Sequence, residues 1–357
     1  MLKVVTARLH PPKPSTQRFD GLTILLVGAS GGIGLEAAKK LVGQGTSILI
    51  ITARDEAKAQ RAKEAIFQHF RSLPAPHRSP TIIPLVVEMT SPASIHRFVA
   101  SLGQSTGHLD HAIISAGVLP GKYEQLDTSF EGSLQVNAIS PSLLSLLLFP
   151  FLLASSLVAK ELVSERPHLT LVSSGAAWLT SRSSISSVMN VEHPLRELSK
   201  KEAFPPGMMG GQIHYCRTKL MLEYSMRHIS GLPSITNSDG QPKVLVCSVC
   251  PGAVNSDLSR YSAGSGFLGA MARVVNNTVA RTAEQGCNIY ISSLSLGAEG
   301  RGEMWTDDHI VTQDHRKYIQ TQVGRAFGER VWDELKAVML QMDAAGGQGV
   351  VTQMLGK

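Results

Sequence analysis

The sequence predicts an α/β protein whose parallel sheet is doubly wound, with helices on both faces in three α/β/α layers. Short aliphatic runs at residues 23–27, 47–52, 81–87 and 111–114 have the length and composition of buried strands. Segments with helical composition and apolar spacing separate these runs. A glycine-rich turn at residues 28–34 joins the first strand to the first helix. This alternation is typical of repeated βαβ units, whose right-handed crossovers cover both faces of one sheet.

The turn at residues 28–34, Gly-Ala-Ser-Gly-Gly-Ile-Gly, indicates a phosphate-binding unit of the Rossmann type. Gly28 would allow the tight turn, Gly32 the approach of a pyrophosphate, and Gly34 the close packing of helix on strand. The start of the following helix would present free N–H groups and the positive end of its dipole to that anion. An ordinary glycine-rich turn could have the same composition, so the motif needs support from elsewhere in the chain.

Arg54 stands where the second predicted strand ends. In Rossmann units an acid at this place holds the ribose 2′-hydroxyl of NAD, whereas an arginine accommodates the 2′-phosphate of NADP. A planar guanidinium can grip a phosphate through two parallel hydrogen bonds. The residue therefore predicts NADP(H) as the cofactor, the alternative being a solvated arginine at a strand end.

The remaining regular elements continue the alternation. Residues 169–172 and 243–249 predict two more strands, and residues 282–294 and 324–342 predict helices. Pro84 lies inside the third predicted strand and indicates a bend or an imperfect strand, because proline cannot donate to a sheet.

Residues 143–153 form a run that is apolar all round. A membrane span needs about 20 predominantly apolar residues. This run reaches that length only with interspersed serines, and Pro141 and Pro150 interrupt it. We expect a buried helix, which could also serve as a subunit interface in a homodimer, and no membrane span.

The composition suits a protein with a sizeable core and argues against some partners. The chain has 357 residues, 43% of them hydrophobic, and a mild net charge of +6. Because no basic run is interleaved with aromatic residues, we expect no nucleic-acid partner. Four cysteines give no disulfide framework, which predicts a cytoplasmic location. Cys247 and Cys250 have the spacing of a redox or zinc pair, but without a second pair nearby we expect no metal.

The sequence predicts one main domain with two flexible ends. Residues 1–20 read as an N-terminal arm, since prolines at 11, 12 and 14 block regular structure. A single Rossmann-type catalytic domain is expected over 21–345. It contains an insertion at 175–214 and a C-terminal substrate-side segment at 255–345, and residues 346–357 read as a loose tail.

Three side chains carry the predicted chemistry. Tyr215 and Lys219 are four residues apart and share one face of a predicted helix. A lysine ammonium beside a phenol favours the phenolate, so we expect the pKa of Tyr215 to be lowered. Such a tyrosine can exchange a proton with a carbonyl or alcohol oxygen, and Ser174 at a neighbouring strand end can hold the same oxygen. Tyrosine and lysine are also ordinary helix-surface residues, so this pair alone is weak evidence. The stronger signal is the order of three motifs along the chain: the glycine turn, the strand end with Ser174, and the Tyr215–Lys219 pair.

In that order the motifs resemble the short-chain dehydrogenase/reductase family, most closely its larger fungal members similar to retinol dehydrogenases. The resemblance covers roughly residues 20–340. It implies that Tyr215 is the acid/base, that Ser174 holds the substrate oxygen, and that Lys219 activates the tyrosine and binds ribose. It also implies that Asn137 orders a relay water.

The resemblance further implies the residues that contact the cofactor. Glu88 stands where the family usually has an aspartate, Ser115 replaces an asparagine, and Ser256 stands where a threonine is common. The implied contacts are Gly28, Ser30, Gly32, Ile33, Gly34, Arg54, Glu88, Ala116, Gly117, Tyr215, Lys219, Pro251, Gly252 and Ser256.

The insertion at 175–214 departs from the family, because the gap from Ser174 to Tyr215 is about three times the common spacing. Its large apolar side chains could line a pocket for a bulky ligand or could pin the segment to the domain. We expect it to fold over the nicotinamide end as one wall of an apolar pocket. The side chains in question are Trp178, Met189, Phe204, Met208 and Met209.

These observations predict an NADPH-dependent oxidoreductase that reduces a ketone or aldehyde, or oxidises the matching alcohol. Its substrate would be a bulky apolar small molecule, a class that includes fungal secondary metabolites. The alternatives are a non-redox isomerase or cyclase on the same NADP-binding scaffold, and a cofactor-bound interaction protein without turnover.

Overall fold

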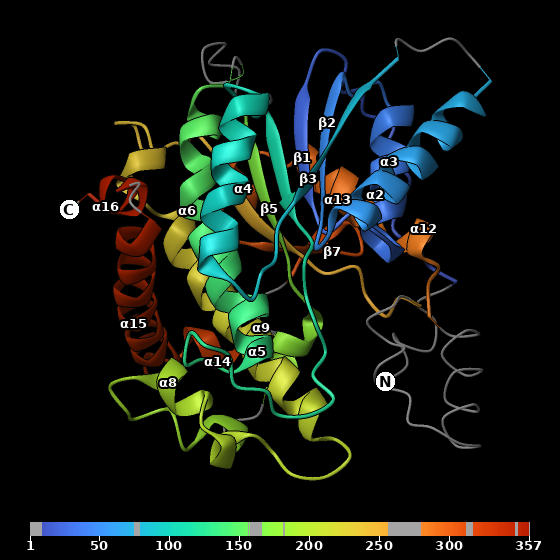
Figure 1. Cartoon of the computed structure of the whole chain (residues 1–357). Helices are drawn as coiled ribbons and strands as arrows, with labels where there is room; N and C mark the ends of the chain where they lie inside the picture. The colour runs from blue at the N-terminus through green and yellow to red at the C-terminus, as the bar shows by residue number, and fades with distance from the viewer. Residues whose placement is uncertain are drawn as a thin grey trace.

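One eight-stranded sheet runs through the computed structural model (Figure 1). The structure describes residues 9–74, 79–155, 157, 166–180, 183–255, 280–311, 317–346 and 349–356. The strand order is β3-β2-β1-β4-β5-β6-β7-β8, parallel throughout except for β8, which pairs antiparallel with β7. The strands are β1 Thr23–Val27, β2 Ile48–Ala53, β3 Thr81–Val86, β4 His111–Ile114, β5 His168–Val172, β6 Leu245–Val249, β7 Met304–Thr306 and β8 His309–Ile310.

Helices cover both faces of this sheet and enclose two apolar cores (Figure 1). One core lies under α4, α6 and α9, and the other under α2, α3 and α13. The predicted doubly wound α/β fold is thus confirmed. The helices are α2 Gly32–Gly43, α3 Glu56–Arg71, α4 Pro92–Ser105, α5 Gly132–Leu134, α6 Ser140–Leu153, α8 Pro194–Leu198, α9 Gly210–Ser230, α12 Ala283–Gly286, α13 Asn288–Ser292, α14 Lys317–Gln320, α15 Gln322–Gly346 and α16 Val350–Met354.

The order of the strands creates the binding crevice. The chain moves outward from β1 through β2 to β3, then returns to place β4 on the other side of β1. Such a switch point leaves a crevice outside the carboxyl ends of the central strands. The glycine turn follows β1 and Ser115 follows β4, so both lie at this crevice.

The apolar run lies in a long helix over Gly132–Leu153, made of α5, a π-helical turn η1 (Gln135–Ile139) and α6. Among the described residues it is the one helix long and apolar enough to cross a membrane, yet 83% of the tested window is buried. Helices α15 and α16 of the same chain pack against α6 (Figure 1). The prediction of a buried helix is confirmed, and its apolar surface is covered without a second subunit.

The structure differs from expectation where local patterns were short. Pro84 sits in a regular strand, which is possible because β3 is the sheet edge and pairs only with β2. The helix expected at 282–294 is broken into α12 and α13, and β7 and β8 were not predicted. The tail expected to be loose forms α16, where buried Val351 donates its N–H to Asp343 at 2.9 Å.

Candidate active site

A cavity of about 1420 Å³ occupies the crevice at the switch point. It reaches from the glycine turn across the end of β4 to the start of α9. Ser256 lies outside the described residues. Asn137 is fully buried and does not line the cavity. The other predicted site residues line this one cavity: Gly28, Ser30, Gly32, Ile33, Gly34, Arg54, Glu88, Ala116, Gly117, Ser174, Tyr215, Lys219, Pro251 and Gly252.

The glycine turn has the geometry that a dinucleotide cradle needs. Gly28 and Gly32 adopt φ of +87° and +53°, a region that favours glycine. A Cβ on Gly34 would lie 2.2 Å from the carbonyl oxygen of Gly28, so only glycine lets the helix approach this closely. Helix α2 begins at the cavity without a side-chain cap, which leaves its first N–H groups for an anion. The turn therefore fits the pyrophosphate of a dinucleotide.

A basic cluster lines the cavity at the end of β2. Arg54 is exposed there, and Lys58 and Arg61 from the first turns of α3 line the same wall. Asp55 caps α3 by accepting the N–H of Lys58 at 2.8 Å and pairs with its ammonium at 2.8 Å. Sequence reasoning found Arg54 but missed the other two cations, although their position just after the strand was a usable signal.

Tyr215 presents its phenol to the cavity from the second turn of α9. Burial raises the pKa of Tyr215, and a hydrogen bond with the Ser174 hydroxyl only partly offsets this. The expectation of a lowered pKa is therefore wrong for this structure, because desolvation of the phenolate outweighs the Ser174 hydrogen bond. A neutral phenol is the form that can donate a proton.

Lys219 lies one turn further along the same face. Its Nζ is 5.9 Å from the centroid of the Tyr215 ring and donates to the carbonyl of Val172 at 2.8 Å. Burial lowers the pKa of Lys219 to about 8, while nearby Glu223 and Cys250 act in the opposite direction. The ammonium is thus held beside the phenol at a fixed position.

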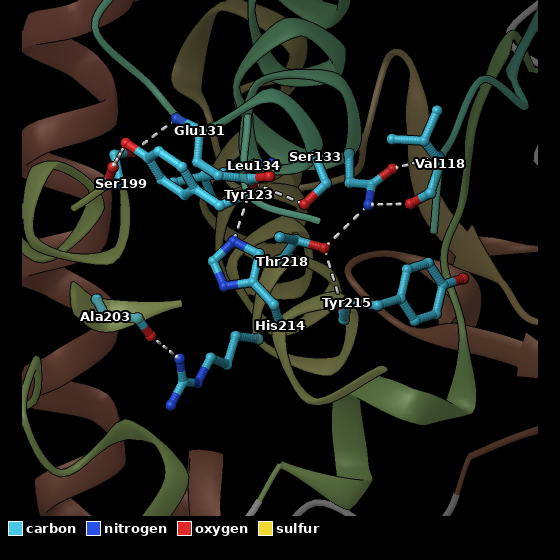
Figure 2. A network of polar contacts seen from close by, with 12 residues as sticks. Val118, Tyr123, Glu131, Ser133, Leu134, Ser199, Ala203, His214, Tyr215 and Thr218 are labelled. Carbon is cyan, nitrogen blue, oxygen red and sulfur yellow. Dashed lines mark hydrogen bonds and ion pairs between the residues drawn. The ribbon is translucent and has the colours of Figure 1, made fainter. Parts of the chain in front are cut away.

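Asn137 lies in the π-helical turn η1, a feature often found at functional sites. Its side-chain amide is fully used, because Oδ1 accepts from the N–H of Val118 at 2.8 Å. Nδ2 donates to the carbonyl of Val118 at 2.8 Å and to Thr218 Oγ1 at 3.0 Å (Figure 2). The role of Asn137 in a water relay stays a prediction.

Two contacts at the cavity were missed from the sequence. Tyr290 of α13 lines the cavity, and its hydroxyl lies 2.9 Å from that of Ser115. Arg281, nearly fully buried, donates to the carbonyl of Pro251 at 3.0 Å and so supports the turn with Gly252. Both residues come from the C-terminal part of the chain, where no local motif marks them.

The insertion does not wall the cavity. Among its described residues none lines the cavity, so the expected apolar wall is not found. Met189 is buried in the main core, and Trp178 donates to Met304 Sδ at 3.3 Å. Met208 and Met209 are instead exposed. Part of the insertion therefore packs into the core of the domain, whereas the part just before α9 exposes its two methionines.

Within the described residues, no group of three or more histidine, cysteine or acidic side chains could hold a metal ion. Cys247 and Cys250 are buried thiols, and the Sγ of Cys250 accepts the N–H of Gly175 at 3.0 Å.

The chain is similar to known short-chain dehydrogenases. The family described as "short chain dehydrogenase" matches residues 22–159. Short-chain dehydrogenase/reductase ffsI of Aspergillus flavipes is 30% identical over 329 residues, which are 92% of this chain and 89% of that protein. Short-chain dehydrogenase/reductase phmF of Phaeosphaeria nodorum is 30% identical over 338 residues, covering 94% and 92%.

Solved structures share the fold at lower identity. A putative uncharacterized protein from Mycobacterium paratuberculosis has a TM-score of 0.58 and 16% identity, covering 92% of this chain and 95% of its own. A putative short chain dehydrogenase from Escherichia coli CFT073, complexed with NADPH, has a TM-score of 0.55 and 17% identity, covering 83% and 100%.

Proposed function

The chain belongs to the short-chain dehydrogenase/reductase family, and on this premise we propose that it is an NADPH-dependent oxidoreductase. It reduces a ketone or aldehyde, or oxidises the matching alcohol, on a bulky apolar small molecule. The observation that carries this proposal is that Ser174, Tyr215 and Lys219 line the same cavity as the glycine turn. When bound, NADPH supplies the hydride.

Each residue has a role that its position supports. The neutral phenol of Tyr215 donates a proton to the carbonyl oxygen, and the Ser174 hydroxyl holds that oxygen by a second hydrogen bond. The ammonium of Lys219 stabilises the negative charge that remains on the phenol after the proton leaves. The glycine turn and the start of α2 hold the pyrophosphate, and the basic cluster holds the 2′-phosphate.

The proposal is tested by following NADPH oxidation with a panel of ketones and aldehydes that includes polycyclic ones. Oxidation dependent on a carbonyl supports it. Conversion of a substrate without NADPH oxidation would favour an isomerase or cyclase on the same scaffold. Binding of NADPH without any turnover would favour an interaction protein.

Arg54→Ala is expected to raise the KM for NADPH about 10-fold and to leave the KM for NADH nearly unchanged. A charge-assisted contact to the 2′-phosphate is lost, but Lys58 and Arg61 remain and limit the effect. Steady-state kinetics with both cofactors measures it, and Arg71→Ala at the far end of α3 is the matched control. If the unmodified protein uses NADPH and NADH equally well, Arg54 does not recognise the 2′-phosphate.

The substrate proposal rests on the size and lining of the cavity. Ligand sites usually have about 300–1,000 Å³, so this cavity has room for a dinucleotide and a second molecule. Val118, Leu119 and Pro120 give it an apolar wall near the start of α9. We place the reaction in the cytoplasm, which is supported by four buried thiols.

Leu119→Glu is expected to raise the KM for bulky apolar carbonyls about 10-fold or more, because a carboxylate would replace part of the apolar wall. The KM for NADPH and for small carbonyls should change less than threefold. Kinetics on one polycyclic and one small ketone measure the difference. A variant that weakens both ketones equally would show that Leu119 does not face the substrate.

A further inference from the structure

Helix α9 carries two pairs of polar residues on different faces. Tyr215 and Lys219 face the cavity, and His214 and Thr218 precede them by one residue each, which turns them by about 100° around the helix. Thr218 meets Asn137, as described above. His214 meets Glu131, with 2.9 Å between Nε2 and Oε2. Figure 2 shows the Tyr215 phenol and the His214 imidazole pointing to different sides of the helix.

The carboxylate of Glu131 makes several hydrogen bonds in a buried position. The side chains of His214 and Glu131 are 0% and 1% exposed. The same Oε2 accepts from Ser133 Oγ at 2.7 Å and from the N–H of Leu134 at 2.9 Å, which caps α5. Burial alone would raise the pKa of Glu131, but these donors and His214 outweigh it and lower the pKa. A carboxylate this deeply buried depends on its partner, because a lone buried charge is costly.

The insertion contacts both Glu131 and His214. Ser199 Oγ accepts the N–H of Glu131 at 3.1 Å, and the Phe204 ring lies 4.9 Å from the His214 ring, centroid to centroid. One residue before Phe204, the Ala203 carbonyl accepts from Arg217 Nη1 of α9 at 2.7 Å. Residues 199–204 are thus tied both to the start of α5 and to the first turns of α9 (Figure 2).

Two other segments approach the first turn of α9 closely. A Cβ on Gly210 would lie 1.9 Å from the carbonyl oxygen of Pro205, and one on Gly211 would lie 1.9 Å from that of Pro120. Pro120 belongs to the loop that lines the cavity. The insertion therefore contacts one side of this turn and the cavity loop contacts another.

We propose that His214 and Glu131 are a positioning pair that holds the insertion against α9 and thereby fixes the phenol of Tyr215 in the cavity. The inference rests on the proposed function of Tyr215. It gives the insertion a specific role: it holds the catalytic helix in place and does not cover the substrate.

The test is His214→Leu, measured by kinetics, by NADPH binding and by hydrogen exchange. We expect kcat to fall about 30- to 100-fold, since a misplacement near 1 Å can cost about 10²-fold. The Kd for NADPH should stay within threefold. His214→Gln, whose amide can still donate to Glu131, should recover activity to within tenfold of the unmodified protein. His228→Leu, on the same helix but stacked on Trp332 at 5.2 Å, is the matched control and should keep its kcat.

Hydrogen exchange separates this inference from the proposed function, because it needs no substrate. In His214→Leu, the exchange of amides in residues 199–211 should accelerate by a larger factor than that of amides in the central strands β1 and β4, and in His228→Leu it should not. A folded His214→Leu variant whose kcat is within threefold of normal would overturn the proposed positioning role of His214 and Glu131. Unchanged amide exchange in residues 199–211 of this variant would overturn it as well. If His214→Leu does not fold, Phe204→Ala removes the ring contact without stranding a buried charge. It should lower kcat about tenfold, and a normal kcat there would equally overturn the proposal.

Discussion

Tyr215→Phe is expected to lower kcat for carbonyl reduction by roughly two to four orders of magnitude, because the variant has no proton to donate. The phenol loses a single hydrogen bond, to Ser174, so the fold and the Kd for NADPH should be unchanged. Stopped-flow or steady-state NADPH oxidation measures the loss, and fluorescence of bound NADPH measures the affinity.

Tyr224→Phe is the matched control for this experiment. It makes the same chemical change in the same helix, at a residue that packs edge-on against Phe327 at 5.6 Å and does not line the cavity. Its kcat should stay close to normal. Turnover of Tyr215→Phe within tenfold of the unmodified protein would mean that another group donates the proton.

The parts of the fold that could be predicted from the sequence are those encoded by local pattern. The strand at 23–27, the turn at 28–34 and the helix after it have signals of composition and spacing within a few residues of each other. The two-residue strand β8 and the five-residue helix α16 are too short for such signals. Strand β8 is defined by its antiparallel pairing with β7, where Ile310 lies opposite Trp305, and α16 is held where Asp343 accepts the N–H of Val351.

The candidate site divides in the same way. Gly34 and Lys219 could be found because the chemistry requires a fixed spacing along one turn or one helix face. The Tyr290–Ser115 contact could not, because it joins residues 175 positions apart. The direction of the Tyr215 pKa was also out of reach, because it depends on how deeply the fold buries the phenol.

Lys219→Met is expected to lower kcat about 10²- to 10³-fold, the size typical of removing one preorganised charge-stabilising group. Because burial brings the pKa of Lys219 to about 8, the lysine is charged below that pH and neutral above it. Reduction by the unmodified protein should therefore be constant near pH 6–7 and fall about tenfold per pH unit above 8, as for loss of one essential proton. In Lys219→Met this fall should disappear.

The same residue links stability to pH in a direction that can be checked separately. The lysine pKa is lower in the folded state than its ordinary 10.5, so between about 8 and 10.5 the unfolded chain binds more protons. The charged, buried lysine thus costs stability at neutral pH, and the free energy of unfolding should rise as the pH increases through this window. Lys219→Met should be more stable than the unmodified protein at pH 7 and lack this rise, as measured by urea unfolding at several pH values. If Lys219→Met is less active and also less stable at pH 7, Lys219 stabilises the fold through its hydrogen bond to the Val172 carbonyl. In that case the buried charge does not lower the free energy of unfolding.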